Sequence, residues 1–500
     1  MSHSSAPSSW PFDSVLVANR GEIAVRVLRT VKKLGLRGIV VYHAADRGAL
    51  AVTMADQAIE ITGSTPVAAY LDAAQILAAA KASGAGAIHP GYGFLSENTG
   101  FARAVEAAGL VFIGPRPEQI ELMGDKVRAR NFVEKGGFPV APSAIEDDDP
   151  ATFVERARLV GAPLLIKPSA GGGGKGMRIV RDLSLLEGEI ERARSEGLRY
   201  FGDGRLYVER YIENPRHIEV QVLGDAYGNV VHVFERECSV QRRFQKIVEE
   251  TPSPALDAPL RERICETAAG IARSAGYRNA GTVEFIFGQG GEFYFLEMNT
   301  RLQVEHPVTE EITGLDLVHE QLRVAAGETL RLQQHDIRSS GHSIEFRIYA
   351  EDPGRGYTPT TGPVLVLHPP QGEGVRWDSG VVQGGEVTSA FDPMIAKLII
   401  RGRDRSDAIA RADAALRDTV LLGCKTNTAF LRRLIAHPAF IAGDVHTGFL
   451  DANPQIAADP ELGEDRLQAL LAVAAMSTQP LREGADVIPE LHAAIGDWTN

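Results

Sequence analysis

The stretch FYFLEMNTRLQVEHPV, residues 293–308, is where an apolar pattern gives way to a polar one. Its first four residues, 293–296, are aromatic and apolar, which is typical of a buried strand. Polar side chains then occupy every second position: Glu297, Asn299, Arg301, Gln303 and Glu305. Because side chains two residues apart share one face of an extended chain, the pattern predicts five hydrogen-bonding groups along one ribbon. A half-exposed strand with its polar face in water is the alternative.

A second strand, GTVEFIF at residues 281–287, is predicted to pair with this stretch as a hairpin. Glu284 interrupts its apolar alternation and would lie close to Glu297 and Asn299. Two carboxylates and an amide supply the hard oxygen ligands that Mg²⁺ prefers. The hairpin therefore predicts a metal site, and Arg301, Gln303 and Glu305 beyond it could hold and deprotonate a small oxyanion. Glutamates that are merely exposed on each strand are the alternative.

A run of glycines lies between two predicted strands in PLLIKPSAGGGGKGMRIV, residues 163–180. It is not the P-loop pattern GxxxxGK[ST], because Ser169 and Gly176 stand where a glycine and a hydroxyl are required. Backbone N–H groups of consecutive glycines can still close over phosphates, and lysines flank the run on both sides. We therefore predict a flexible phosphate-covering loop, with a mobile hairpin tip as the alternative.

The length and the amino-terminal pattern predict the fold class. A chain of 500 residues suggests about three domains. Near the amino terminus, an apolar strand at 14–18 precedes a helical pattern that ends at Gly35, and a second strand follows at 38–42. This β-α-β unit predicts an α/β (α+β) protein with a parallel sheet. The turn Asn19-Arg20-Gly21 is not GxGxxG, so the sequence does not indicate a dinucleotide-binding site.

Composition excludes several classes of protein. The net charge of −13 argues against nucleic-acid binding. Residues 451–500 carry nine acidic and two basic side chains, so this tail holds much of the excess charge. Three separated cysteines predict neither a disulfide framework nor a zinc site. No apolar run is long enough to cross a membrane, and residues 2–9 read as a leader without the features of a signal peptide. We expect a cytoplasmic protein.

Several motifs follow one another along the chain: NRGEIA, AIHPGYGFLSEN, MGDK, KPSAGGGGKGM, ENPRHIEVQV, ECSVQRR, EFYFLEMNTRLQVEHPVTE and AEDP. Together they resemble the biotin carboxylase module of biotin-dependent, acyl-CoA type carboxylases, in the ATP-grasp superfamily. The resemblance covers roughly residues 12–450. It implies a Rossmann-like parallel-sheet domain at 12–125, an ATP-grasp domain at 126–342 with a glycine-loop lid at about 141–212, a C-terminal α+β domain at 343–450, a disordered leader at 1–11 and an acidic, partly helical extension at 451–500.

The resemblance also implies roles for individual residues. ATP would be bound by Lys126, Lys167, Gly172, Gly173, Gly174, Lys175, Gly176, Glu209, His217 and Gln241. Mg²⁺ or Mn²⁺ would be bound by Glu284, Glu297 and Asn299. Bicarbonate and biotin would lie against Lys246, Arg301, Gln303, Val304 and Arg347. Catalysis would depend on Glu305 as the base that deprotonates bicarbonate, on Arg347 to stabilise the enolate of biotin, and on Lys246 and Arg301.

The implied activity is that of an ATP-dependent ligase. It would carboxylate biotin with bicarbonate through carboxyphosphate, as the first half-reaction of a biotin-dependent carboxylase. Biotin carriers present a lysine in a Met-Lys-Met setting, and no methionine here precedes a lysine. Biotin is therefore expected on a carrier protein or domain, the further partner is a carboxyltransferase subunit, and the assembly is a homodimer or larger complex. The final acyl acceptor, and whether the chain is a stand-alone subunit or part of a longer α-subunit, stay open.

One position departs from the family pattern. Many relatives have histidine where this chain has Phe244, and a phenyl ring cannot donate a hydrogen bond. Two other functions stay open at this stage. Another ATP-grasp ligase with an acyl-phosphate intermediate would share the nucleotide and metal residues, and a non-catalytic ATP-binding scaffold would explain Phe244. The presence of every expected metal ligand and of Glu305 counts against the scaffold.

Overall fold

The computed structural model describes residues 10–146, 149–168, 177–201, 203–243, 245–459 and 463–478. The chain forms two compact units, Met1–Ile456 and Ala457–Asn500. Residues 1–9, which make up most of the predicted leader, lie outside the described residues.

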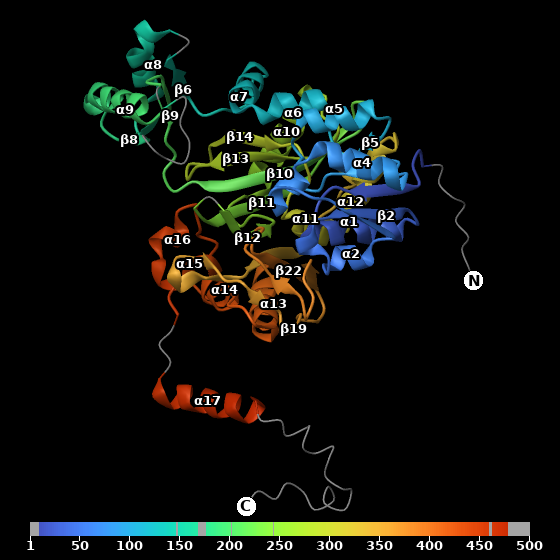
Figure 1. Ribbon diagram of the computed structural model, residues 1–500. Helices are drawn as coiled ribbons and strands as arrows, with labels where there is room; N and C mark the ends of the chain where they lie inside the picture. Colours follow the sequence, from blue (N-terminus) through green and yellow to red (C-terminus); the bar gives the residue numbers. More distant parts are fainter. Residues whose placement is uncertain are drawn as a thin grey trace, which may run out of the picture. The chain divides into compact units, whose positions relative to one another are not determined.

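A five-stranded parallel sheet begins the larger unit, with the strand order β3-β2-β1-β4-β5. Its central strand is buried on both faces, because Val15 and Val17 belong to one apolar core and Leu16 to another. Coverage on both faces is expected of a parallel sheet, and helices surround it in Figure 1. The elements are β1 Ser14–Val17, α1 Gly21–Lys33, β2 Arg37–Tyr42, α2 Leu50–Met54, β3 Gln57–Glu60, α3 Pro66–Tyr70, α4 Ala73–Ser83, β4 Ala87–His89, α5 Thr99–Ala107, β5 Val111–Phe112 and α6 Pro117–Gly124.

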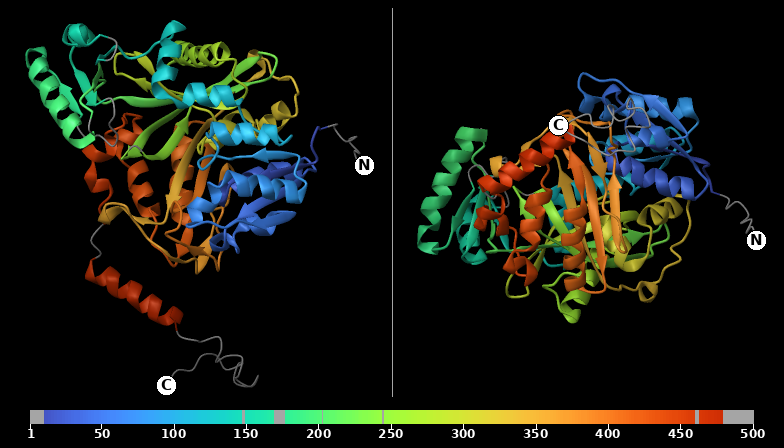
Figure 2. Two further views of the ribbon diagram at one scale, coloured as in Figure 1. Left: turned by 45° about the horizontal axis from the view of Figure 1, so that its top comes forward. Right: turned by 90° about the horizontal axis from the view of Figure 1, so that it is seen from below.

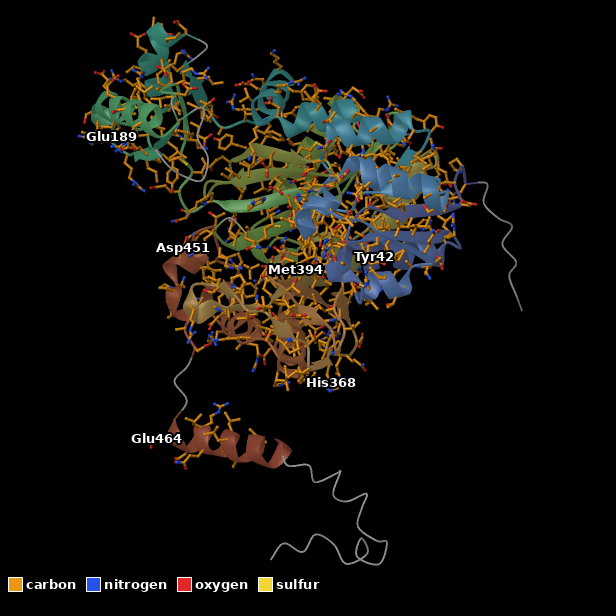
Figure 3. All side chains as sticks on the ribbon, viewed as in Figure 1. Tyr42, Glu189, His368, Met394, Asp451 and Glu464 are labelled. Atoms are coloured by element: carbon orange, nitrogen blue, oxygen red, sulfur yellow. The ribbon has the colours of Figure 1, made fainter. Side chains whose placement is uncertain are left out.

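A small four-stranded sheet, with the order β6-β9-β7-β8, follows helix α7 (Lys126–Lys135). Two helices pack on it around their own apolar core, in which Phe153 and Ile190 meet strand residues such as Val208. Glu189, labelled in Figure 3, marks the longer of these helices. The elements are β6 Ser143–Ile145, α8 Phe153–Val160, β7 Leu164–Pro168, β8 Arg178–Val180, α9 Leu186–Phe201 and β9 Leu206–Arg210.

An eight-stranded antiparallel sheet forms the centre of the larger unit, in the order β14-β13-β10-β11-β12-β15-β22-β20. Helix α11 contacts β11, β12, β15 and β22, while α10 contacts β10 and β11. The elements are β10 Arg216–Gly224, β11 Val230–Arg242, β12 Gln245–Thr251, α10 Ala258–Ser274, β13 Asn279–Phe287, β14 Phe293–Asn299, α11 His306–Thr313, α12 Leu317–Ala325, β15 His342–Tyr349, β20 Val375–Ser379 and β22 Met394–Gly402. This sheet runs across the predicted boundary at 342/343, since β15, β22 and β20 continue the ladder that β12 begins.

Short strands and helices complete the larger unit. Helix α13 packs on β22 and β15, and both views of Figure 2 show these orange elements side by side. The remaining elements are β16 Glu351–Asp352, β17 Thr358–Pro359, β18 Gly362–Pro363, β19 Val366–His368, β21 Glu386–Val387, α13 Arg405–Asp418, β23 Val420–Leu422, α14 Thr428–Ile435, α15 Pro438–Ile441 and α16 Phe449–Ala452.

The smaller unit contains one described helix, α17 (Glu464–Thr478). Four of its apolar side chains are exposed: Leu467, Leu470, Leu471 and Val473. Across the ranges that the structure describes, no helix combines the length and the apolar character needed to cross a membrane.

The predicted α/β class is confirmed, and so are the first β-α-β unit and the hairpin of β13 with β14. The single ribbon predicted to extend through Glu305 is wrong, because β14 ends at Asn299. The chain turns between residues 300 and 305, and Glu305 is the N-cap residue of α11.

Candidate active site

Lys246, on β12, lies at the centre of a buried group of charged side chains. Its Nζ atom is 2.5 Å from Glu219, 2.7 Å from Glu305 and 2.9 Å from Glu284. These carboxylates come from β10, from the start of α11 and from β13, and each of their side chains is at most 4% exposed. Burial alone would lower the pKa of Lys246, but the three carboxylates hold it well above its usual value. The side chain is therefore an ammonium that three acids share.

Arg347, on β15, provides a second cation beside Glu305. Its Nη2 donates to Glu305 Oε2 at 3.0 Å and its Nε donates to Glu249 Oε1 at 2.6 Å. Burial would raise the pKa of Glu305, but the Lys246 ammonium and the Arg347 guanidinium hold it below its usual range. Glu305 is therefore an ionised carboxylate with one oxygen on each cation.

A third cation, Arg236 on β11, is completely buried beneath Glu219. Its Nε donates to Glu219, and its other nitrogens donate to Gln221, Thr282 and Thr309. Burial nevertheless raises the pKa of Glu219, because the neighbouring carboxylates of Glu305 and Glu284 add to the cost of its charge. The group holds more acid than its cations comfortably neutralise, which suits a site that binds further cations.

The predicted metal ligands meet across the β13–β14 hairpin. A β-bulge at Leu296 shifts the register so that Glu284 lies opposite Glu297, whereas a regular ladder would place Leu296 there. Asn299 Nδ2 donates to Glu284 Oε1 at 2.9 Å. Glu297 is paired with Lys126 at 2.8 Å. The hairpin therefore brings two carboxylates and an amide to one end of two strands, and this oxygen set fits Mg²⁺ chemistry.

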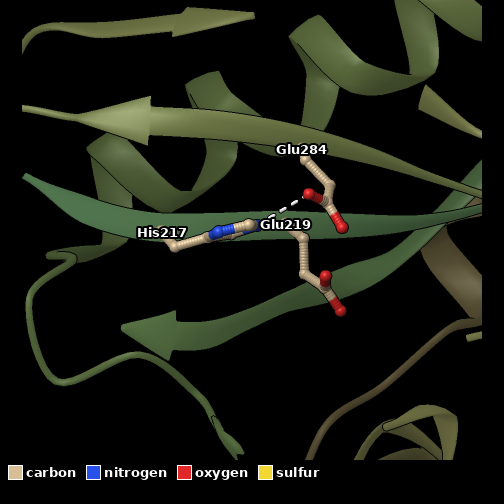
Figure 4. Close-up of side chains that lie close together, drawn as sticks. All are labelled: His217, Glu219 and Glu284. Carbon is tan, nitrogen blue, oxygen red and sulfur yellow. Dashed lines mark ion pairs between the residues drawn. The ribbon is translucent and has the colours of Figure 1, made fainter. Parts of the chain in front are cut away.

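His217 and Glu219, neighbours on one face of β10, lie beside Glu284. Figure 4 shows the imidazole of His217 and both carboxylates converging from two adjacent strands. His217 Nε2 is 2.9 Å from Glu284 Oε2. Burial would raise the pKa of Glu284, but Lys246 and His217 hold it well below its usual value. Glu284 therefore keeps its charge, as a metal ligand must.

The turn after β14 gathers its polar groups by folding back on itself. Arg301 donates from Nη2 to Asn299 Oδ1 at 2.9 Å and from Nη1 to Gln303 Oε1 at 2.8 Å. Gln303 Nε2 in turn donates to Glu284 Oε1 at 3.0 Å. The five groups predicted on one ribbon thus share a hydrogen-bonded network, although a turn and not a strand brings them together.

The residues predicted to bind nucleotide occupy several elements. Lys167 on β7 and Glu209 on β9 form an ion pair with each other in the small sheet. Gln241 on β11 lies opposite Lys246 in the ladder, and the carbonyl of Val304 accepts a hydrogen bond from Lys397. Gly172, Gly173, Gly174, Lys175 and Gly176 of the predicted glycine loop, as well as Phe244, lie outside the described residues.

Sequence reasoning missed four charged residues that contact this site. Glu97, from the loop after β4, accepts from Arg301 Nε at 2.9 Å and from the Thr300 backbone N–H at 3.0 Å. The other three, Glu219, Arg236 and Glu249, are fully or almost fully buried on adjacent strands. Charged residues within apolar alternation, as in HIEVQV and VFERECSV, are the signal that could have indicated them.

Comparison with family models matches most of the chain. The model of the biotin carboxylase N-terminal domain matches residues 11–120, and that of the biotin carboxylase C-terminal domain matches residues 345–452. The model of the carbamoyl-phosphate synthase L chain ATP-binding domain matches residues 125–333, which lie between them.

Individual relatives match over nearly the same range. Biotin carboxylase 2 of Bacillus subtilis is 49% identical over 440 residues, which are 88% of this chain and 99% of that protein. The biotin carboxylase domain dimer of Hydrogenobacter thermophilus 2-oxoglutarate carboxylase, solved with MgADP, ADP and bicarbonate, superposes with a TM-score of 0.81 and 46% identity, covering 90% of this chain and 99% of that one. The crystal structure of the biotin carboxylase component of a pyruvate carboxylase superposes with a TM-score of 0.83 and 44% identity, covering 90% of this chain and 100% of that one.

Proposed function

This chain belongs to the biotin carboxylase family, and we propose that it uses ATP and bicarbonate to carboxylate biotin presented by a carrier protein or domain. The observation that carries the proposal is the contact of Glu305 with two cations, Lys246 at 2.7 Å and Arg347 at 3.0 Å. A base held between two cations fits a reaction whose reactants and intermediates are anions.

Glu305 is proposed to take the proton of bicarbonate. Its low pKa keeps it ionised but makes it a weak base while both cations are bound to it. Lys246 and Arg347 are also the nearest cations for bicarbonate and for the enolate oxygen of biotin. As these anions attract the two cations away from Glu305, the basicity of the carboxylate would recover. Binding of the substrates would in this way activate the base.

Arg301, Gln303 and Val304 are proposed to form the anion pocket beside the base. Arg301 is already oriented by Glu97, Asn299 and Gln303, so binding need not order a flexible side chain. Deprotonated bicarbonate would attack the γ-phosphoryl group of ATP and form carboxyphosphate. Arg347 would then stabilise the negative charge that develops on the oxygen of biotin during carboxylation.

Glu284, Glu297 and Asn299 are the proposed Mg²⁺ ligands, and Mn²⁺ stays a prediction. A bound Mg²⁺ draws negative charge from the phosphoryl group that is transferred. Lys126, now paired with Glu297, would reach the phosphates, as would Lys167 from the small sheet. Glu209, His217, Gln241 and the glycine loop complete the proposed nucleotide site.

The matching domain models favour this function over another ATP-grasp ligase. The carbamoyl-phosphate synthase model matches only the central segment, and the biotin carboxylase models match the segments on either side of it. The same ranges support the proposed domains at 12–125, 126–342 and 343–450, with one sheet shared across the second boundary. A cytoplasmic location, a carboxyltransferase partner and assembly as a dimer or larger complex are proposals by analogy. Relatives that are named for pyruvate and for 2-oxoglutarate leave the final acceptor open.

The test is ADP release with ATP, Mg²⁺ and bicarbonate, measured with and without free biotin, for the wild-type protein and Glu305→Gln. We expect bicarbonate-dependent release that biotin stimulates, and a loss of about 10²- to 10⁴-fold in the variant, because the base is removed without a change of shape. Glu106→Gln, on the exposed face of α5, is the matched control and should behave as wild type.

Two other outcomes would point elsewhere. Turnover that responds to ammonia or an amino acid and not to biotin would move the chain to another ATP-grasp ligase. Binding of ATP without turnover, even with a biotinylated carrier present, would support a scaffold.

A further inference from the structure

Lys397 is a buried lysine in the apolar strand β22, whose sequence is MIAKLIIRG. Its side chain is 0% exposed, and it is among the largest fully buried side chains of the described residues. A buried ammonium is costly unless it is paired and hydrogen-bonded. What it contacts is therefore informative.

Lys397 contacts the turn that carries the proposed base. Its Nζ donates to the carbonyl oxygen of Val304 at 2.7 Å, and it lies 3.2 Å from Glu22 Oε2. Glu22, on α1, also accepts a hydrogen bond from the Tyr92 hydroxyl. Parts of the chain that are distant in sequence thus meet at one backbone carbonyl.

The other charged groups around Lys397 do not replace these contacts. Arg347 and Asp378 are its partners in the two neighbouring ladders, and Asp378 pairs with Arg376 and Arg29. Glu345 is also nearby, but neither of its oxygens has a hydrogen-bond partner. Within the described part of the chain, the Val304 carbonyl and Glu22 are therefore the direct polar contacts of the ammonium.

We propose that Lys397 is a positioning residue for the proposed base Glu305, which it holds through the carbonyl of Val304. The carbonyl of Val304 and the N–H of Glu305 belong to one planar peptide unit. An ammonium that holds this carbonyl fixes the plane from which the Glu305 side chain leaves the backbone. This inference rests on the proposed function, and it assigns to Lys397 no contact with a substrate.

The arrangement also explains why a lysine is tolerated in this strand. The carbonyl oxygen of Val304 precedes the N-cap of α11, where the backbone changes from a turn to a helix. Lys397 joins this point to the central sheet, and Glu22 joins it to the N-terminal domain. A displacement of reacting groups by about 1 Å can reduce a rate about 10²-fold, so a fixed carbonyl is valuable for catalysis.

The test compares Lys397→Met, Glu22→Gln and the double variant Lys397→Met/Glu22→Gln. Methionine keeps the apolar length of lysine but removes the ammonium, and the double variant avoids leaving Glu22 buried without its cation. For the double variant we expect kcat of biotin-dependent ADP release to fall about 10- to 100-fold, with an unchanged KM for ATP. Glu22→Gln alone should keep most of the activity, because Lys397 still holds the carbonyl.

Lys81→Met, exposed on α4, is the matched control for the lysine substitution. A double variant that melts at a lower temperature but keeps wild-type kcat would show a purely structural lysine and overturn the proposal. If the wild-type protein itself shows no biotin-stimulated turnover, the proposed function and this inference both fail. Wild-type turnover with an equally active double variant would overturn this inference alone.

Discussion

Helix α11 joins two buried ionic clusters that differ in their balance of charge. At its start lies the Lys246 cluster, made of Glu219, Arg236, Lys246, Glu249, Glu284, Glu305, Glu345 and Arg347. Glu310, within the same helix, belongs to the Arg26 cluster, made of Arg26, Glu310, Asp316, Arg376 and Asp378. Arg26 contacts Glu310 at 2.6 Å and Asp316 at 2.7 Å, and Arg376 contacts Glu310 at 2.9 Å and Asp378 at 2.7 Å.

The pKa shifts of the two clusters run in different directions. Burial would raise the pKa values of Asp316 and Asp378, but Arg26 and Arg376 lower them, that of Asp378 to about 2. In the Lys246 cluster, burial and neighbouring carboxylates instead raise the pKa values of Glu219, Glu249 and Glu345. The Arg26 cluster is matched and satisfies itself, as a structural cluster should. The Lys246 cluster has acid to spare, which is the state of a site that awaits cations and a charged substrate.

Replacing Lys246 with methionine should have the largest effect on activity. The ammonium orients Glu305 and neutralises Glu219 and Glu284, so its loss removes the proposed base from its working position. We expect biotin-dependent ADP release to fall about 10²- to 10⁴-fold. Stability should change less than the number of broken contacts suggests, since acids with raised pKa values can take up protons in place of the lost cation.

Arg26→Met, in the matched cluster, is the mirror of that substitution. It leaves Glu310 and Asp316 without a buried partner and should reduce the free energy of unfolding by about 3–5 kcal/mol. Specific activity of the folded protein should stay near wild type. Urea unfolding and turnover, measured on both variants, check the contrast. If both variants lose activity and stability alike, the two clusters do not differ in role.

The sequence could predict the chemistry of the Lys246 cluster but not its construction. Glu284, Glu297 and Asn299 were predictable because their alternation survives in a strand, and the structure brings them to one hairpin. The bulge at Leu296, which aligns the two glutamates, follows from packing of the sheet and leaves no local pattern. The turn at residues 300–305 was not predicted, because a polar residue at every second position reads as continued strand.

Long-range partners were beyond prediction for a different reason. Glu97 and Lys397 lie about 200 and 90 positions away in sequence from the residues they contact, Arg301 and Val304. Nothing in a single sequence relates such distant positions. A lysine within MIAKLII or a glutamate within HSIEFRIY signals only that a buried charge needs some partner.

The pH dependence of stability should separate the two clusters next. Burial raises the pKa of Glu249 to about 7, and the nearby charge of Glu305 adds to the shift, while Arg347 opposes it. An unfolded glutamate has a pKa of about 4.3. Between these values the folded protein binds more protons than the unfolded chain, so the free energy of unfolding falls as pH rises. The loss is on the order of 3 kcal/mol across this window.

Glu249→Gln should flatten that slope, because glutamine cannot titrate. Urea unfolding at several pH values between 5 and 8, for the wild-type protein and the variant, measures the difference. Asp378→Asn in the Arg26 cluster should leave the same slope unchanged, since the pKa of Asp378 is about 2 and this residue does not titrate in the window. A slope that is equal in wild type and Glu249→Gln would contradict the account of the Lys246 cluster.

Glu345→Gln should have the smallest effect, although the side chain is 0% exposed. Burial holds the pKa of Glu345 well above its usual value, and Lys397 is too weakly engaged to reverse this. A protonated carboxyl and a carboxamide are both neutral and nearly the same shape, so the free energy of unfolding should change by less than about 1 kcal/mol. The matched substitution Glu310→Gln removes an ionised partner of two arginines and should cost about 3 kcal/mol. Equal costs at the two positions would mean that Glu345 is ionised and pairs with Lys397, and the distinction between a matched and an unmatched cluster would fail.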